Sequence, residues 1–326
     1  MIVTQYLKVN ASHPEQEIID ISAQLIKSGK LVAFPTETVY GLGADAFNSS
    51  AVAKIFQVKG RPPENALLIH VSSLLQVDGL VEEISPTAQK LVEHFWPGPL
   101  SIILPASSRV PEIVRGGKSG VGLRMPSHPV ALALIDATGP LAAPSANLYG
   151  RPSPTNAGHV RQDLDGRIAA VLDAGETGTG LESTLIDLCN AKHQILRRGG
   201  ISVEELEEFL KEKIEIMQAE SVSQYTMKCQ AFMSENEEDF QAQLDSLRSQ
   251  GRKIGIVHID SRIAHKIENG GLVYNLDLSG QGMSLYSILR AAEGNGIEIL
   301  LFTPIDPELA GLAPAMMDRI RRAASR

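Results

Sequence analysis

The chain has 326 residues, of which 43% are hydrophobic and 21% charged, and its formal net charge at pH 7 is −8. This length is enough for two domains with separate cores, and the acidic balance argues against a whole-surface nucleic-acid binder, because phosphate backbones select basic faces. Cys189 and Cys229 have no CxxC partner, which argues against a disulfide framework and a structural zinc site. Without a signal-peptide pattern or an apolar run near the roughly 18 residues that span a bilayer, we expect a cytoplasmic protein with no membrane partner.

In chain order, the first 215 residues alternate between helix and strand patterns. Ser12-His13-Pro14 is typical of a helix start, and Gly29 of the end of that helix. Further helices are expected at 48–58, from Ser85-Pro86 to Trp96, and at 203–210. Short apolar runs predict strands at 31–34, 66–71, 101–104, 121–124, 141–143, 169–172, 183–187 and 194–197. This alternation predicts an α/β domain over residues 1–215.

The character of the chain changes after this domain. Residues 216–240 are polar and weakly periodic, and we interpret them as an interdomain linker that runs into a helix. Residues 241–326 are expected to form a small α/β domain, with strands at 254–258, 272–276 and 297–302 and helices at 284–292 and 313–324.

Three short segments place polar or cationic side chains after apolar, strand-like or helical runs. They are Pro35 to Gly43 (PTETVYGLG), Lys59-Gly60-Arg61-Pro62 and Pro144-Ser145-Ala146-Asn147. Strand ends in open α/β sheets are where ligands bind, and fixed cations, hydroxyls and an amide suit an anionic ligand. Together the segments indicate a nucleotide-using enzyme.

Each segment also has a plainer interpretation. Lys59 and Arg61 could be cations at an exposed helix end, where they face the helix dipole. Ser145 and Asn147 are typical of a turn after a strand. Arg124, alone in an apolar strand, must be paired either by an internal carboxylate or by the carboxylate of a ligand. The glycine-rich stretch 178–184 carries only a weak signal by itself.

Several known motifs are absent. Gly117-Lys118-Ser119 resembles the tail of a P-loop, but Glu112 stands where the earlier glycine is required. The stretch 175–180 lacks the GxGxxG spacing of a dinucleotide-binding fingerprint. We find no Ser-His-Asp or Cys-His arrangement, and therefore no candidate covalent nucleophile. His258 and Asp260 alternate on a strand and could bind a metal, but no further ligand is nearby, so we expect no metal site.

With these segments laid out, the chain resembles the threonylcarbamoyl-AMP synthase family in its long two-domain form. The resemblance covers nearly the whole chain and is carried by PTETVYGLGADA, KIFQVKGRP, WPGPL, VGLRMPSHP, APSAN, GRPSPT, LESTLID, ILRRGGIS and the closing GLAPAMMDRIRRAA. It implies an open, twisted, mixed α/β sheet with flanking helices and a positive cleft (YrdC-like), followed by a small Rossmann-like domain.

The resemblance also implies an activity and a site. The activity is nucleotidyl transfer: L-threonine, bicarbonate and ATP, with Mg²⁺, give threonylcarbamoyl-AMP and pyrophosphate, and the product serves a threonylcarbamoyl-transferase complex that modifies tRNA. Binding of double-stranded RNA is a further expectation. The signature cluster would be Lys59, Arg61, Ser145 and Asn147. Threonine would be held by Thr36, Thr38, His70, Arg124, Ala143 and Ser183, and ATP by Arg61, Asn65, Gly120, Ser145, Ser153 and Arg197.

The chain departs from the family pattern in three places. Ala66 and Arg198 stand where the family usually has proline. The linker lacks the usual Pro-Gly-Met stretch and His-Tyr pair, for which only Tyr225 or Phe232 could substitute, and we expect an altered lid over the nucleotide.

Three alternatives remain open. They are carbamoyl-adenylate chemistry as in hydrogenase-maturation carbamoyltransferases, an RNA-binding or translation-associated module, and an inactive paralogue. The two cysteines are too few for the zinc-finger-like parts of the first. The acidic charge and the low aromatic content of 5% argue against the second, because single-strand binders use aromatic stacking platforms.

Overall fold

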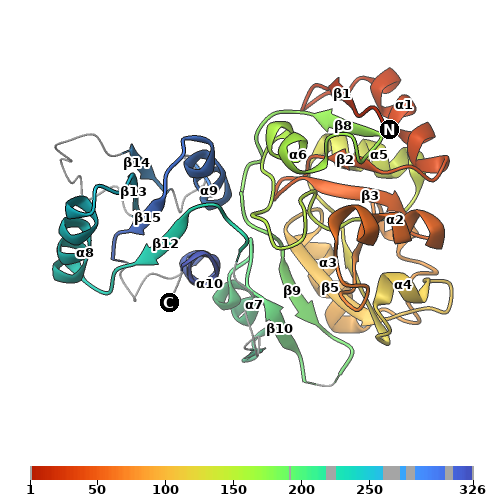
Figure 1. The fold of residues 1–326 in the computed structure, drawn as a ribbon. Coiled ribbons are helices and arrows are strands. Elements are labelled where there is room, and N and C mark those ends of the chain that lie inside the picture. The colour runs from red at the N-terminus through yellow and green to blue at the C-terminus, as the bar shows by residue number, and fades with distance from the viewer. Residues whose placement is uncertain are drawn as a thin grey trace. The chain divides into compact units, whose positions relative to one another are not determined.

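The structure is a computed structural model that describes residues 2–190, 192–217, 225–259, 272–276, 283–304 and 311–324. The chain divides into two compact units (Figure 1). The first unit comprises Met1–Tyr149 and Ser153–Gln218, and the second comprises Gly150–Pro152 and Ala219–Arg326. A three-residue excursion from the first part of the chain therefore belongs to the second unit.

The first unit is built on a mixed sheet, as the sequence predicted. In the described residues the sheet has eleven strands in the order β1 (Gln5–Lys8), β8 (Ala170–Asp173), β2 (Val32–Phe34), β3 (Gly41–Asp45), β7 (Leu141–Ala142), β4 (Leu68–His70), β6 (Gly120–Arg124), β5 (Leu100–Pro105), β9 (Thr184–Asp187), β10 (Gln194–Arg197) and β11 (Glu215–Ile216). Strand pairs β4–β6 and β5–β9 are parallel, whereas β2–β3 and β5–β6 are antiparallel.

Two apolar cores lie on opposite faces of this sheet, because successive strand residues point to opposite sides. Val32 and Phe34 belong to one core, whereas Ala33 between them belongs to the other. Helices α1 and α5 pack together in the first of these cores. The helices are α1 (Gln16–Lys27), α2 (Ser49–Lys59), α3 (Pro86–Phe95), α4 (Glu112–Arg115), α5 (Pro129–Thr138), α6 (Ala157–Leu164), α7 (Val203–Leu210) and a 3₁₀ turn (Leu74–Gln76).

Helix α2 delivers Lys59 to the interior. The Asn48 side chain caps its first turn by accepting a hydrogen bond from the Ala51 amide at 3.0 Å. The buried face of the helix ends with Lys59 itself. Gly60 then adopts a left-handed conformation with φ 64°, which ends the helix and turns the chain toward Arg61.

One local prediction was wrong. Helix α1 begins at Gln16 and not near Ser12, because the Asn10 side chain accepts hydrogen bonds from the amides of Ser12 and His13 and holds them in a turn. The sequence did not predict strand β3, which begins at Gly41 inside the first motif and pairs back with β2.

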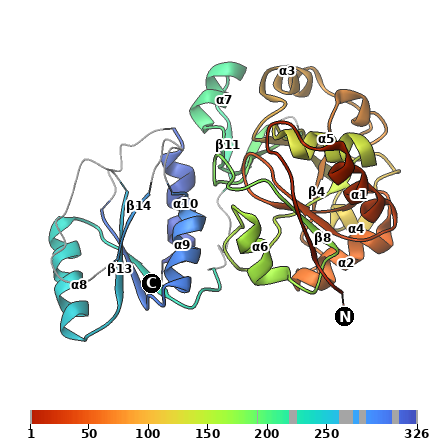
Figure 2. The same ribbon diagram turned by 90° about the horizontal axis from the view of Figure 1, so that it is seen from above.

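The second unit contains a parallel four-stranded sheet in the order β12 (Gln230–Met233), β15 (Ile299–Phe302), β13 (Ile254–His258) and β14 (Leu272–Asn275). Helix α8 (Glu237–Ser249) covers one face, and α9 (Leu285–Gly294) and α10 (Ala313–Ala323) lie on the other (Figure 2). The predicted small α/β domain is thus confirmed, and β12 with the first turn of α8 falls inside the stretch 216–240. Among the described residues, no helix has both the length and the apolar composition that a bilayer crossing needs.

The segment Gly150–Pro152 is anchored inside the second unit at three points. The Thr226 amide donates to the Gly150 carbonyl at 2.8 Å, and the Arg151 guanidinium pairs with Glu293 at 2.7 Å. The buried Arg290 guanidinium donates to the Pro152 carbonyl at 2.6 Å. Each residue of the segment therefore has its own partner.

The expected lid residues are only partly described. Residues 218–224 lie outside the described part of the chain. Tyr225 packs edge-on against Tyr286 with ring centroids 6.0 Å apart, and the Arg322 guanidinium lies 4.5 Å from its ring centroid. Tyr225 is therefore engaged within the second unit.

Replacing Tyr40 by phenylalanine should lower the free energy of unfolding by about 1–3 kcal/mol. The fully buried Tyr40 hydroxyl donates to the Gly175 carbonyl at 2.8 Å and accepts from the Ala174 amide at 3.2 Å. Both partners would lose their hydrogen bond in the variant. Urea unfolding measures the change, and Tyr6→Phe, whose hydroxyl bonds the exposed Asp165, should shift stability by less than about 0.5 kcal/mol. Equal losses in the two variants would contradict this prediction.

Candidate active site

Polar side chains gather on one face of the central strands of the first unit. The register sets the residues of the opposite, buried face: Ile69, Leu123, Ile102, Ile186 and Ile195. The alternate positions of β4, β6 and β5 include His70, Arg124 and Ser101. Arg197 joins their face because β10 is bulged between Ile195 and Arg197, which pairs Arg197 with Leu185. One face is therefore apolar and covered, and the other carries cations and hydroxyls.

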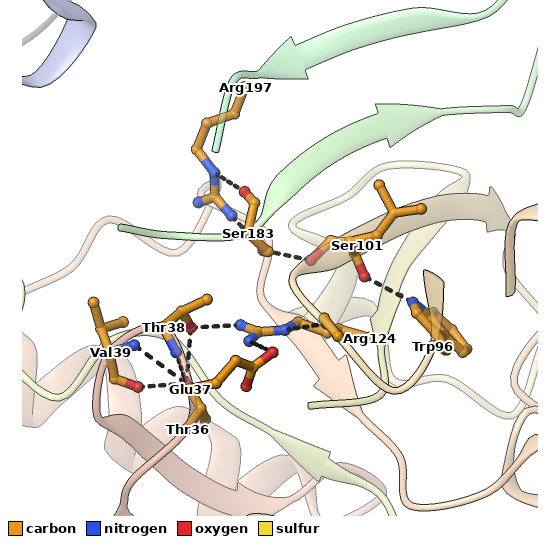
Figure 3. Close-up of polar contacts among 11 residues, drawn as sticks. Thr36, Glu37, Thr38, Val39, Trp96, Ser101, Arg124, Ser183 and Arg197 are labelled. Carbon is orange, nitrogen blue, oxygen red and sulfur yellow. Dashed lines mark hydrogen bonds and ion pairs between the residues drawn. The ribbon is translucent and has the colours of Figure 1, made fainter. Parts of the chain in front are cut away.

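Arg124 ends β6 and is 3% exposed. Its Nη1 donates to Thr38 Oγ1 at 2.9 Å, its Nε donates to the Gly98 carbonyl at 3.2 Å, and its Nη2 lies 2.7 Å from Glu37 Oε1 (Figure 3). The sequence left two candidate partners open, an internal carboxylate or a ligand. In this structure the internal carboxylate of Glu37 pairs with the guanidinium.

The two threonines of the first motif form a directed chain of hydrogen bonds with Arg124. Thr36 Oγ1 donates to the Val39 carbonyl at 2.7 Å, so it must accept from Thr38 Oγ1, which lies 2.8 Å away (Figure 3). Thr38 Oγ1 in turn accepts from Arg124. The hydroxyl protons of Thr36 and Thr38 are therefore oriented in one direction, and the polar groups of the turn after β2 are held in place by hydrogen bonds.

Ser183 and Arg197 extend the same face. Arg197 Nε donates to the Ser183 carbonyl and Nη2 to Ser183 Oγ, both at 3.0 Å, and Ser183 Oγ lies 2.7 Å from Ser101 Oγ (Figure 3). Ser183 Oγ therefore accepts from the arginine, and it shares a hydrogen bond with Ser101 Oγ in which either hydroxyl can be the donor. We call Thr36, Glu37, Thr38, His70, Arg124, Ser183 and Arg197 the arginine cluster.

His70 ends β4 and is paired in register with Arg124 of β6. The side chain is buried, and its Nδ1 has no hydrogen-bond partner among the described residues. Burial, together with the positive charges of Arg124 and Arg197, lowers the pKa of His70 to about 3. The imidazole is therefore neutral at physiological pH and can accept or donate a hydrogen bond without adding charge.

A second group forms at the end of α2. Lys59 is 3% exposed, and its ammonium donates to the backbone carbonyls of Ser145 and Asn147. The Asn147 amide group donates to the Leu148 carbonyl at 2.8 Å. Lys59 thus fixes the turn after β7, and the alternative of an exposed helix end is wrong for this lysine.

Arg61 and Asn65 meet around an aromatic ring. Arg61 donates to the carbonyls of Asn65 at 3.2 Å and Ala66 at 3.1 Å, and its guanidinium carbon lies 5.9 Å from the ring centroid of Tyr149. Asn65 donates to the Tyr149 hydroxyl at 3.3 Å. Burial lowers the pKa of Arg61. We call Lys59, Arg61, Asn65, Ser145 and Asn147 the lysine cluster.

The first motif runs beside the turn of the lysine cluster. The Leu42 amide donates to the Pro144 carbonyl, the Ala146 amide donates to the Tyr40 carbonyl, and Gly41 forms a bridge with Ser145. Because the same motif supplies Thr36 and Thr38, one continuous segment contributes to both clusters.

Three other predicted residues lie at different points of the first unit. The Ala143 amide, just after β7, donates to the Leu68 carbonyl at 2.9 Å, and Gly120 begins β6 opposite Pro105. Ser153 is buried outside the strands, and its hydroxyl donates to Glu182 Oε1 at 2.9 Å. These contacts involve no side chain of the arginine cluster or of the lysine cluster.

Sequence reasoning missed four contributors: Glu37, Ser101, Tyr149 and Glu182. Ser101 interrupts an otherwise apolar strand, and Glu37 stands inside the first motif, so both carried a signal. Tyr149 and Glu182 lie in loops, and the sequence alone does not show which side chains a loop residue contacts.

Acid should destabilise the protein partly through His70. Unfolded His70 takes up a proton below its ordinary pKa of 6.5, whereas folded His70 does so only near its lowered pKa of about 3. Between these values the unfolded state binds more protons, so stability falls as the pH falls, by about 1.4 kcal/mol per pH unit from this group. We expect His70→Gln to make the urea-unfolding free energy less steep between pH 6 and 4. The exposed His13→Gln is the control, and a wild-type slope in His70→Gln would refute the assignment.

The fold and the two clusters define a two-unit α/β protein with a cationic, hydroxyl-lined site for anionic ligands. Residues 24–199 match the Sua5, YciO and YrdC family model, whose description is "Telomere recombination", and residues 201–325 match "Threonylcarbamoyl-AMP synthase, C-terminal domain". The chain belongs to the threonylcarbamoyl-AMP synthase family, in its two-domain form.

Similarity to individual proteins also supports membership of this family. The chain is 37% identical to the threonylcarbamoyl-AMP synthase of Pyrococcus abyssi, covering 95% of each chain. It is 36% identical to the enzyme of that name from Bacillus subtilis, over 93% of this chain and 92% of the relative. The crystal structure of P. abyssi Sua5 complexed with L-threonine superposes with a TM-score of 0.89 at 36% identity, covering 98% of both chains.

Proposed function

We propose that this protein makes L-threonylcarbamoyladenylate from L-threonine, bicarbonate and ATP and releases pyrophosphate. Two-domain relatives over nearly the full chain carry the name of this enzyme, and one of them was crystallised with L-threonine. The observation in this chain that carries the proposal is the buried Arg124 guanidinium beside the ordered hydroxyls of Thr36 and Thr38. A fixed fork of donors next to hydroxyls suits a small hydroxy amino acid with a carboxylate.

The reaction has two bond-forming steps. The threonine ammonium first loses a proton to water, and the neutral amine then attacks bicarbonate, which gives the N-carboxylate and water. An oxygen of that carboxylate then attacks the α-phosphorus of ATP, and the bond from this phosphorus to the bridging oxygen breaks. Pyrophosphate leaves with the electron pair of that bond.

Every species near the reacting phosphorus is negative, so the protein acts mainly by positioning and by offsetting charge. We assign Thr36, Thr38, His70, Arg124, Ala143 and Ser183 to threonine, and Arg61, Asn65, Gly120, Ser145, Ser153 and Arg197 to ATP. Lys59 holds the turn 145–147 through its carbonyls, and we assign Lys59, Arg61, Ser145 and Asn147 to the reacting phosphate and carbamate. The neutral His70 accepts or donates one hydrogen bond to the threonine side chain.

Mg²⁺ enters as part of the ATP substrate. The described residues contain no group of three or more His, Cys, Asp or Glu side chains placed to hold a metal ion. Phosphate oxygens and water commonly supply most ligands of a nucleotide-bound Mg²⁺. Downstream, we propose that the product is passed to a threonylcarbamoyl-transferase complex acting on tRNA in the cytoplasm, where these substrates occur together.

Pyrophosphate release from ATP tests the proposal. The purified full chain should release pyrophosphate only when threonine, bicarbonate and Mg²⁺ are all present. Release independent of threonine would contradict it. Salt-dependent tRNA binding without threonine-dependent release would instead favour an RNA-binding module.

A further inference from the structure

Glu37 is the carboxylate of the arginine cluster, and it is incompletely satisfied. Its side chain is 17% exposed, yet both carboxylate oxygens are shielded from solvent and accept no hydrogen bond in the described structure. Its ion pair with Arg124 Nη2, at 2.7 Å, lacks hydrogen-bond alignment, because Nη2 is likewise without a hydrogen-bond partner. Buried charged groups normally have hydrogen-bond partners, so the Glu37 carboxylate and Arg124 Nη2 can each still hydrogen-bond a ligand.

The hydrogen-bond donors of Arg124 and acceptors of Glu37 that remain unused match one kind of ligand. Arg124 directs Nη1 to Thr38 and Nε to Gly98, which leaves the N–H groups of Nη2 as donors. Glu37 offers two acceptor oxygens directly beside them. A carboxylate needs the donors and an ammonium needs the acceptors, and an α-amino acid carries both groups one carbon apart.

The surrounding charges leave Glu37 as the counterpart of an ammonium in this cluster. Arg124 and Arg197 are both cations, and the neutral His70 adds no negative charge. The nearby carboxylate of Glu182 already accepts the hydrogen bond from Ser153. Glu37 is also held in place, since its own carbonyl accepts a hydrogen bond from the Thr179 amide at 2.8 Å.

We infer that Glu37 and Arg124 form a two-part receptor for the zwitterion of the amino acid substrate. The substrate carboxylate takes Nη2 of Arg124 from Glu37, and the freed Glu37 carboxylate accepts hydrogen bonds from the substrate ammonium. Glu37 is thus a specificity-determining residue. This inference rests on the proposed use of threonine and adds the group that recognises its amine.

A consequence is discrimination against molecules that carry only one of the two charges. A hydroxy acid without the amine would occupy Arg124 and leave the Glu37 carboxylate buried without a cation. Such unpaired burial is costly, so the pair should reject deaminated analogues more strongly than a neutral site would.

Calorimetric titration with L-threonine and with 3-hydroxybutyrate, which is threonine without its amine, tests this inference on the full chain. Wild type should bind threonine and should bind 3-hydroxybutyrate measurably but far more weakly. Glu37→Gln should weaken threonine binding by about 30- to 1000-fold and leave 3-hydroxybutyrate binding unchanged or tighter. Equal weakening of both ligands, or unchanged threonine binding, would overturn the inference.

Two further variants separate recognition from general damage. Glu207→Gln removes a carboxylate of matched exposure, 16%, that pairs with Lys213 as Glu37 pairs with Arg124, and it should leave both affinities unchanged. Glu37→Asp retains the charge on a shorter arm and should recover part of the preference for threonine over 3-hydroxybutyrate. Failure of wild type to bind threonine would overturn the proposed function as well, whereas failure confined to the variants would overturn only the role of Glu37.

Discussion

Lys59→Met should reduce kcat/KM for pyrophosphate release by about 10³-fold. Methionine retains an unbranched chain that lacks only the terminal atom of lysine, and it removes the ammonium that donates to the carbonyls of Ser145 and Asn147. Without it the turn after β7 loses its anchor, and two shielded carbonyls lose a charged donor. Because Ser145 and Asn147 are assigned to the reacting groups, the loss should fall mainly on kcat.

A matched control for Lys59→Met lies on the same helix. Lys54 also donates from Nζ to a backbone carbonyl, that of Gly29 at 2.7 Å, but it is exposed and far along the helix from the turn. Lys54→Met should retain kcat/KM within about twofold. Urea unfolding of both variants shows whether they are folded, and a folded Lys59→Met enzyme with wild-type kcat would rule out this role for Lys59.

Arg124→Gln should raise the KM for threonine by about 100-fold or more and change the KM for ATP little. The substitution removes the fork that we assign to the substrate carboxylate. It also removes the cation that pairs with Glu37, whose carboxylate oxygens accept no hydrogen bond in the described structure. Because a buried charge is then left unpaired, the free energy of unfolding should fall by about 3–5 kcal/mol.

The double variant Arg124→Gln, Glu37→Gln separates these two effects. Removing both charges should recover most of the stability, because no buried ion remains unpaired, but it should not recover threonine affinity. Arg115→Gln, which removes a partly exposed arginine bonded to the Lys118 carbonyl, is the control for loss of a positive charge. Parallel rises in the KM for threonine and ATP would count against the assignment of Arg124 to threonine.

Local patterns predicted much of the fold because they report local physics. The strand expected at 194–197 and the helix expected at 203–210 appear in the structure with the same bounds, and the helix expected at 48–58 is α2, which begins at Ser49 and ends at Lys59. The missed elements have weaker signals. Strand β3 is Gly-Leu-Gly-Ala-Asp, in which two glycines hide the strand pattern, and its pairing with β2 is a tertiary effect.

The residues of the candidate site were found in sequence, but their arrangement was not. That Arg124 needed a counter-charge followed from the cost of burying a cation, yet the identity of Glu37 depends on how β2 and β6 are placed in the sheet. The grouping of His70, Arg124, Ser101 and Arg197 on one face depends on register between strands distant in sequence. That register depends on which strands pair, and the pairing cannot be read from the sequence of one chain.

The assignment of Gly150–Pro152 bears on how this chain could be divided. The segment lies in sequence between two stretches of the first unit, but it belongs to the second unit, where Thr226, Glu293 and Arg290 hold it. A protein cut after residue 217 would retain the segment and lose all three of these partners. The chain passes between the units at 149/150, 152/153 and 218/219, so no single cut separates one unit from the other.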